Sequence, residues 1–170
     1  MSTEWMSAAA ERIQSDSAAG RLTTEESLRI LEGEGPHDAA LLPETFPEIR
    51  ILPGKTREYL YNSRIMSETY AEILFHNEEQ DYSGQVLQTV RRESRLYPRT
   101  TAIARFLEPP YLIPEDLLPG IVESLLSEGG PLEKCRASNG AEHLFSPKHL
   151  VRSQAEYLAE WEEVGVFESQ

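Results

Sequence analysis

The sequence predicts a mainly α-helical protein with one β-hairpin, an α+β fold in which an N-terminal helical hairpin precedes a C-terminal winged-helix-like domain. Two patterns predict the helices: apolar residues recur at helical spacing, and capping residues or glycines stand at the ends of these runs. A third pattern predicts the β-hairpin. In "ASNGAEHLF", Asn139 and Gly140 separate two alternating runs, and Asn-Gly favours tight hairpin turns.

Length and composition fit a small globular protein. The 170 residues suffice for one domain, or for a domain with an appended arm, and 26% of them are charged. The single cysteine, Cys135, excludes an intramolecular disulfide and is interpreted as a small buried hydrophobic residue. The N-terminus lacks the features of a signal peptide, and no apolar stretch approaches the length of about 18 residues that a membrane helix needs. We therefore expect a cytoplasmic protein without a membrane segment.

The N-terminal part is expected to contain helices and a connecting segment. Residues 1–35 predict a helical hairpin, whose second helix begins at a capping box formed by Thr23 and Glu26. The first helix is indicated by an apolar stripe: Trp5, Met6, Ala9 and Ile13. Residues 36–62 contain several prolines and are interpreted as a proline-rich connecting segment, with a short edge strand at "IRIL". No internal repeat is evident.

Residues 63–170 are expected to form a helical domain with a winged-helix-like core at about 82–145 and a C-terminal helix that Ser146 caps. The expected elements of the core are helix 83–97, short helix 101–107, helix 114–128 and the hairpin at 132–145. Three helices followed by a hairpin is the element order of a winged helix, the helix-turn-helix variant with a β-wing. The sequence resembles this fold in element order and length alone.

The predicted hairpin has two different faces. A two-residue loop at Asn-Gly would pair Arg136 with His143 and Cys135 with Leu144. On this register, Lys134 lies beside Arg136 and His143 on a small basic surface. Cys135 lies on the opposite face and packs against the helices.

The charge of the chain disfavours a polyanionic partner. The formal net charge is −13, which repels nucleic acid and anionic membranes. The expected recognition helix carries four acids and no base, and Pro119 predicts either a kink or a later start for it. The candidate partner-binding residues are basic and lie on the preceding helix and the hairpin: Arg91, Arg92, Arg95, Arg99, Lys134 and Arg136. The stripe formed by the four arginines either grips an acidic partner or pairs with the protein's own acidic segments.

No catalytic constellation is recognisable. The sequence has no glycine-rich phosphate loop, no HExxH and no GxSxG motif, so we expect no catalytic residues and no cofactor. Glu72, His76 and Glu79 share one helical face and are weak metal candidates. A metal site needs ligands from a second element, so we interpret these residues as a surface ion-pair face and expect no metal.

These observations predict a non-catalytic, protein-binding accessory or regulatory module that docks on a partner protein. Two alternatives stay open. One is a winged-helix DNA-binding regulator that uses the basic stripe and the wing, and the other is a small enzyme or enzyme subunit with an unrecognised site. A protein partner is expected, nucleic acid and membrane are not, and a homo-oligomer is left open.

Overall fold

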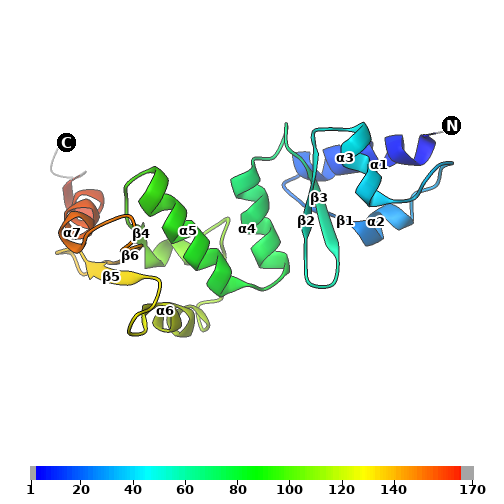
Figure 1. The fold of residues 1–170 in the computed structure, drawn as a ribbon. Helices are drawn as coiled ribbons and strands as arrows, with labels where there is room; N and C mark the ends of the chain where they lie inside the picture. Colours follow the sequence, from blue (N-terminus) through cyan, green and yellow to red (C-terminus); the bar gives the residue numbers. More distant parts are fainter. Residues whose placement is uncertain (1–2, 166–170) are drawn as a thin grey trace. The chain divides into compact units, whose positions relative to one another are not determined.

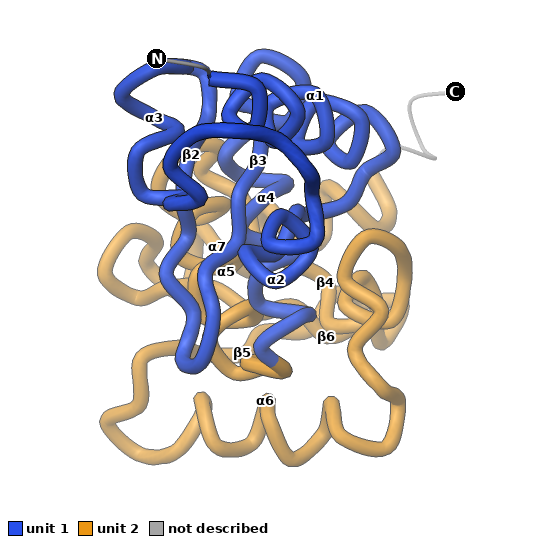
Figure 2. The backbone as a smooth tube through the Cα atoms, turned by 90° about the vertical axis from the view of Figure 1, so that its right-hand side faces the viewer, with its two compact units in different colours: residues 1–79 blue, residues 80–170 orange. Residues whose placement is uncertain are grey.

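The chain forms two compact units, Met1–Glu79 and Gln80–Gln170, of which the computed structural model describes residues 3–165 (Figure 1 and Figure 2). Each unit combines helices with a three-stranded antiparallel sheet, which confirms the predicted α+β, mainly helical class. The predicted divisions after residues 35 and 62 do not coincide with the division between the units. The segments on both sides of those positions contribute strands and helices to the first unit. Within the described residues, no helix is both long and apolar enough to span a membrane.

The first unit packs its helices on a sheet of order β1-β3-β2. Its elements are α1 (Glu4–Ala18), β1 (Thr23–Thr24), α2 (Glu25–Arg29), the 3-10 helix η1 (Ala39–Leu41), α3 (Leu42–Thr45), β2 (Ile49–Pro53), β3 (Glu58–Asn62) and α4 (Glu68–Glu78). β2 is the edge strand predicted at "IRIL". β3 is the central strand and was not predicted, because its near-continuous burial hides the alternation by which strands are recognised.

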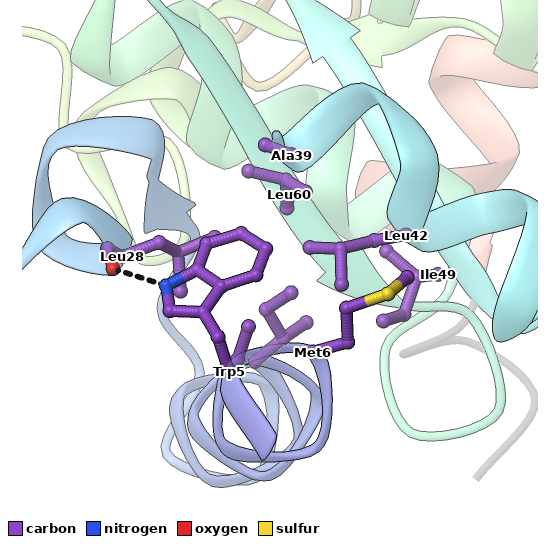
Figure 3. Close-up of a cluster of buried hydrophobic side chains, with 9 residues drawn as sticks. Trp5, Met6, Leu28, Ala39, Leu42, Ile49 and Leu60 are labelled. Carbon is purple, nitrogen blue, oxygen red and sulfur yellow. Dashed lines mark hydrogen bonds between the residues drawn. The ribbon is translucent and has the colours of Figure 1, made fainter. Parts of the chain in front are cut away.

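Trp5 lies at the centre of the core of the first unit. Its indole Nε1 donates a hydrogen bond to the carbonyl oxygen of Leu28 at 3.1 Å, so the buried ring leaves no polar group unsatisfied. Figure 3 shows Trp5 and Met6 extending from α1 toward Leu28, Leu42 and Leu60. The four residues predicted to form the apolar stripe of this helix are all buried, which confirms the spacing argument.

α2 begins one residue later than predicted. Its N-cap is Thr24, whose Oγ1 accepts a hydrogen bond from the backbone N–H of Ser27 at 3.3 Å. Thr23 instead pairs with Leu60 in the sheet, and its hydroxyl donates to Asp16 at 3.0 Å. The hydroxyl that the sequence assigned to a helix cap therefore serves a buried carboxylate.

The second unit has a sheet of order β4-β6-β5. Its elements are α5 (Tyr82–Leu96), β4 (Thr101–Ala102), the 3-10 helix η2 (Ile103–Leu107), α6 (Leu118–Leu126), β5 (Glu133–Arg136), β6 (Glu142–Phe145), α7 (Arg152–Glu160) and the π-helix η3 (Trp161–Gly165). The last helix begins later than predicted. Residues 147–149 form a turn and Val151 is extended, so Ser146 does not cap it.

The loop of the β5–β6 hairpin is one residue longer than predicted. The N–H of Ala137 donates to the carbonyl oxygen of Ala141, and the N–H of Gly140 donates to that of Ala137, both at 3.0 Å. The loop therefore comprises residues 138–140, with Gly140 at φ +90° and Asn139 outside the positive-φ region. This geometry fits a type I turn followed by a left-handed residue, a common three-residue hairpin loop.

The longer loop shifts the pairing of the hairpin, so the predicted register is wrong. Arg136 pairs with Glu142, and Cys135 pairs with His143. Because side chains alternate along a strand, a one-residue slip exchanges the two faces of β6. His143 lies on the same face as Cys135, and Glu142 takes its predicted place beside Lys134 and Arg136.

The two units repeat one arrangement, although no repeat was evident from the sequence. Each contains a 15-residue helix, a two-residue strand and a five-residue helix, then a helix whose second residue is proline, a hairpin and a final helix. In each sheet the two-residue strand pairs with the second strand of the hairpin. The longest sequence trace of this repeat that we note is Leu-Leu-Pro at residues 41–43 and 117–119.

Equivalent positions of the two units are buried alike. The sheet pairing aligns them, because Thr23 pairs with Leu60 as Thr101 pairs with Leu144. The matched buried residues include Ala9 and Val86, Ile13 and Val90, Leu28 and Phe106, Tyr61 and Phe145, Met66 and Leu150, and Ala71 and Ala155. These pairs share size and burial more often than identity.

The first helix of each unit ends at a buried carboxylate. In the first unit this is Asp16, which is 4% exposed and accepts hydrogen bonds from Arg12 at 2.9 Å, Arg21 at 3.0 Å and Thr23 at 3.0 Å. Burial alone would raise the pKa of Asp16. The hydrogen bonds from Arg21, Arg12 and Thr23 outweigh burial, so the pKa lies below its ordinary value.

The equivalent carboxylate of the second unit is Glu93, which is 5% exposed. Arg105 donates a hydrogen bond to it at 2.8 Å, and Arg99 donates a second one. The next residue in each unit is a serine that joins this helix to the hairpin. The hydroxyl oxygen of Ser94 accepts from the N–H of Ser146 at 3.0 Å, and Ser17 does the same at the end of β3. We call each arginine–carboxylate group the clamp of its unit.

Replacing Asp16 by Asn should lower the free energy of unfolding by about 2 kcal/mol at neutral pH, because the charge-assisted hydrogen bonds of the clamp are lost. The pKa of Asp16 is lower in the folded protein than in the unfolded one. Its contribution is therefore complete above the ordinary aspartate pKa of about 3.9 and is lost as the pH falls through the folded value. Urea unfolding of parent and variant should converge in acid, and Asp116→Asn, at an exposed aspartate, is the control.

Replacing Gly140 by Ala should destabilise the protein by about 1 kcal/mol, because a Cβ is unfavourable at its positive φ. Gly120 is the matched control, since a Cβ at either glycine would meet open space but Gly120 lies in α6. Gly120→Ala should stabilise by about 0.5–1 kcal/mol. Equal thermal melting temperatures for the two variants would contradict the three-residue loop.

Candidate partner-binding groove

The second unit contains an apolar groove of about 870 Å³. Its walls come from η2, α6 and the β5–β6 hairpin, and its volume lies within the range of protein ligand pockets. The principal apolar side chains that line it are Ile103, Leu107, Leu118, Val122, Leu126 and Ala141. We call this feature the groove.

α6 supplies most of the apolar lining. The helix starts at Leu118, so Pro119 lies in its first turn, where the missing N–H is not needed. Of the two outcomes that Pro119 predicted, the later start is the one found. Leu118, Val122 and Leu126 follow one another at a spacing of four residues and all line the groove; the first two are buried and Leu126 is partly buried. The apolar stripe of the helix therefore forms the wall of the groove, and Leu125 is buried beside it.

The charged residues around the groove are mostly acidic. Four carboxylates and one amine contribute to its lining: Glu115, Glu123, Glu142, Glu163 and Lys134. Lys134 pairs with Glu142 at 2.6 Å, so the amine is already neutralised within the hairpin. The groove therefore combines an apolar floor with a net negative edge.

The equivalent face of the first unit is charged. η2 of the second unit corresponds to α2 of the first, and both have five residues. Where η2 presents Ile103 and Leu107 to the groove, α2 has Glu25 and Arg29, which pair with each other at 2.7 Å. The shared arrangement thus tolerates an ion pair at these positions. The apolar character of the groove is not a requirement of the fold.

A carboxylate from the end of the last helix holds the hairpin next to the groove. Glu163 accepts a hydrogen bond from the side chain of Asn139 at 3.0 Å, and its Oε1 lies 2.6 Å from Nε2 of His143. The hydrogen bonds from Asn139 and His143 hold the pKa of Glu163 below its ordinary value. Glu163 also lines the groove, so this contact, which we call the latch, shapes one of its walls.

The latch includes a chain of three polar side chains that resembles a catalytic triad in composition. Oγ1 of Thr100 lies 2.9 Å from Nδ1 of His143, whose other nitrogen contacts Glu163. Thr100 is 1% exposed and His143 is fully buried. A nucleophile must be reachable by its substrate, so this chain fits a structural role.

The first unit has the same latch, and it uses one of the predicted metal candidates. Glu79 follows α4 and accepts a hydrogen bond from the N–H of Lys55 in the β2–β3 turn at 3.4 Å. Burial raises the pKa of Tyr59, and a hydrogen bond with Glu79 raises it further. Tyr59 is the counterpart of His143, because it pairs with Thr24 in β1 as His143 pairs with Ala102 in β4. Glu79 follows α4 as Glu163 follows α7.

The structure does not bring the metal candidates together as a site. Glu79 belongs to the latch of the first unit, and His76 is buried on α4 near Phe75, whose ring centroid lies 5.6 Å away. Among residues 3–165, no group of three histidine, cysteine, aspartate or glutamate side chains has a geometry that could hold a metal ion. Glu72 lies on the same helix and is partly buried.

Three of the six basic residues predicted to bind a partner form ion pairs with carboxylates of the chain itself. Lys134 and Arg136 share Glu142, at 2.6 and 3.2 Å. Arg99 is bound to Glu93 in the clamp of the second unit. Of the predicted residues, these three therefore have structural contacts in the folded chain.

The other members of the predicted stripe stay on α5. Arg91 and Arg95 are exposed, and Arg92 is partly buried. Sequence reasoning missed Glu93, which binds the last arginine of the stripe, and it missed the lining of the groove. The apolar run "LLPGIVESLL" contains the α6 residues that line the groove, but such a run is equally typical of a helix that faces a core.

Fold and groove together define a small, mainly helical α+β module that repeats one arrangement and has an apolar groove in its second copy. The family model described as the YdhW C-terminal domain matches residues 80–167, more than half of the chain, and the chain belongs to this family. The chain is 28% identical over 126 residues to the uncharacterized protein YdhW of Escherichia coli (strain K12), which covers 73% of this chain and 59% of that protein. The chain thus spans less than two thirds of that relative's length. No solved structure matches it.

Replacing Glu163 by Ala should lower the free energy of unfolding by about 1 kcal/mol, because Asn139 and the buried His143 lose their acceptor. Glu162 is the matched control: it is adjacent, more exposed, and lies 3.8 Å from His143. Glu162→Ala should change stability by less than about 0.5 kcal/mol. Denaturant melts of both variants measure the difference, and equal losses would show that the latch has no specific role.

Proposed function

We propose that the chain is a non-catalytic accessory or regulatory module that binds a partner protein through the groove. The supporting observation is the contrast between the two copies of one arrangement. The first copy has Glu25 and Arg29 where the second presents Ile103 and Leu107 to the groove. Apolar residues that a fold does not need, gathered in a concave surface, are typical of an interaction site.

The element order of the second unit supports a winged-helix-like fold, and its charges favour a partner other than DNA. Its helices precede a hairpin, and its short first strand pairs with the returning strand of that hairpin. In a DNA-binding winged helix, α6 would be the recognition helix. Here α6 has Glu123 and no lysine or arginine, and Glu142 already binds Lys134 and Arg136. Phosphates placed on this face would meet carboxylates, which favours a protein partner over DNA.

The test transfers the charged pair of the first unit into the groove. The double variant Ile103→Glu with Leu107→Arg should fold like the parent, because the equivalent positions of the first unit accommodate these residue types. It should lose the partner, since two charges would be buried at an apolar contact. A photo-crosslinking amino acid at Leu126, followed by mass spectrometry of products formed in the source cell, measures binding. Circular dichroism confirms folding.

The matched crosslinking control is Glu128, which is exposed just beyond α6 and is not part of the groove. We expect one protein to be crosslinked at position 126, none at 128, and none in the double variant. A protein that crosslinks equally at both positions, or that the double variant retains, would contradict the proposal. Sequence-specific binding of duplex DNA that Arg91→Gln and Arg95→Gln abolish would instead favour the DNA-binding regulator.

A further inference from the structure

We propose that the occupant of the groove is an amphipathic helix of the partner whose apolar face is flanked by lysine or arginine. This inference rests on the proposed function and specifies the chemistry of the partner. A helix laid in a groove uses apolar anchors on one face and leaves its flanking positions to meet the rim. The identity of those flanking residues follows from the charges around the groove.

The carboxylates of the rim differ in what already binds them. Glu142 is paired with Lys134 and Arg136, and Glu163 is held in the latch. Glu115 and Glu123 are exposed, and no ion pair within residues 3–165 includes either of them. Both belong to the α6 side of the groove, one just before the helix and the other within it.

The α6 edge therefore presents two available carboxylates beside an apolar floor. A partner with acidic flanks would place like charges against Glu115 and Glu123, which disfavours binding. A partner with basic flanks gains two ion pairs at the rim and steering by the net charge of −13. The apolar floor contributes most of the affinity, and the charges of the rim determine the specificity for a basic partner.

The test uses a fluorescein-labelled synthetic peptide of leucine and lysine, with the leucines on one helical face, and the full-length chain. Fluorescence anisotropy measures binding. The same peptide with glutamate in place of lysine is the charge-reversed probe. We expect saturable binding of the lysine peptide and no measurable binding of the glutamate peptide.

Two pairs of variants distinguish attraction by the carboxylates of the groove from attraction by the net negative charge of the chain. Glu115→Gln with Glu123→Gln should weaken the lysine peptide about fivefold, since exposed ion pairs contribute little each. Glu11→Gln with Glu32→Gln changes the net charge equally at exposed positions of the first unit and should leave the affinity unchanged. Equal weakening by both pairs would mean that only the overall charge attracts the peptide, which would overturn the inference.

The remaining outcomes distinguish this inference from the proposed function. If the glutamate peptide binds as well as the lysine peptide, and Ile103→Glu with Leu107→Arg abolishes both, the groove is a binding site and the basic flanks are refuted. If the lysine peptide binds but the groove variant retains it, the inference is overturned, because the peptide binds elsewhere, and the crosslinking experiment decides the proposed function. If the lysine peptide does not bind saturably, the inference is overturned, and the crosslinking experiment still decides the proposed function.

Discussion

A buried carboxylate at the end of the first helix is the interaction on which each unit depends. A charge taken out of water is destabilising unless hydrogen bonds and opposite charges surround it, so its partners must be placed accurately. In the first unit, Asp16 draws Arg21 and Thr23 to the end of α1, which sets where the chain turns and where β1 joins the sheet. Glu93 does the same with Arg99 and Arg105 in the second unit. The first strand of each sheet directly follows that turn.

The clamp and the latch occur in both units, whereas the segment between the second helix and the hairpin differs between them. Between the second helix and the hairpin, the first unit has the 3-10 helix η1 and the four-residue α3, which ends shortly before Pro47. The second unit has the nine-residue α6 at the equivalent place. The longer helix provides an additional wall of the groove. The difference in function that we propose therefore arises in a segment that takes no part in the clamp or the latch.

Local patterns predicted the fold class, the stripe of α1 and the edge strand β2, because each depends on neighbours in the sequence. The central strand β3 was not predicted, because it is buried on both faces and shows no alternation of apolar and polar residues. The hairpin register failed because Asn-Gly suits two- and three-residue loops alike, and one residue decides which face holds His143. The groove could not be predicted, since an apolar helix facing a cavity has the same composition as one facing a core. The two copies share sizes and contacts but few identities, so their repetition is visible in the structure and hardly in the sequence.

The burial of Cys135 has a chemical consequence. Burial in the hairpin raises the pKa of the Cys135 thiol, so the reactive thiolate is scarce at neutral pH and reagents cannot reach it in the closed state. The chain has no other thiol. Cys135 packs against Ala155 and Ala159 of α7, so the rate at which a thiol reagent modifies the native protein reports how often this packing opens locally.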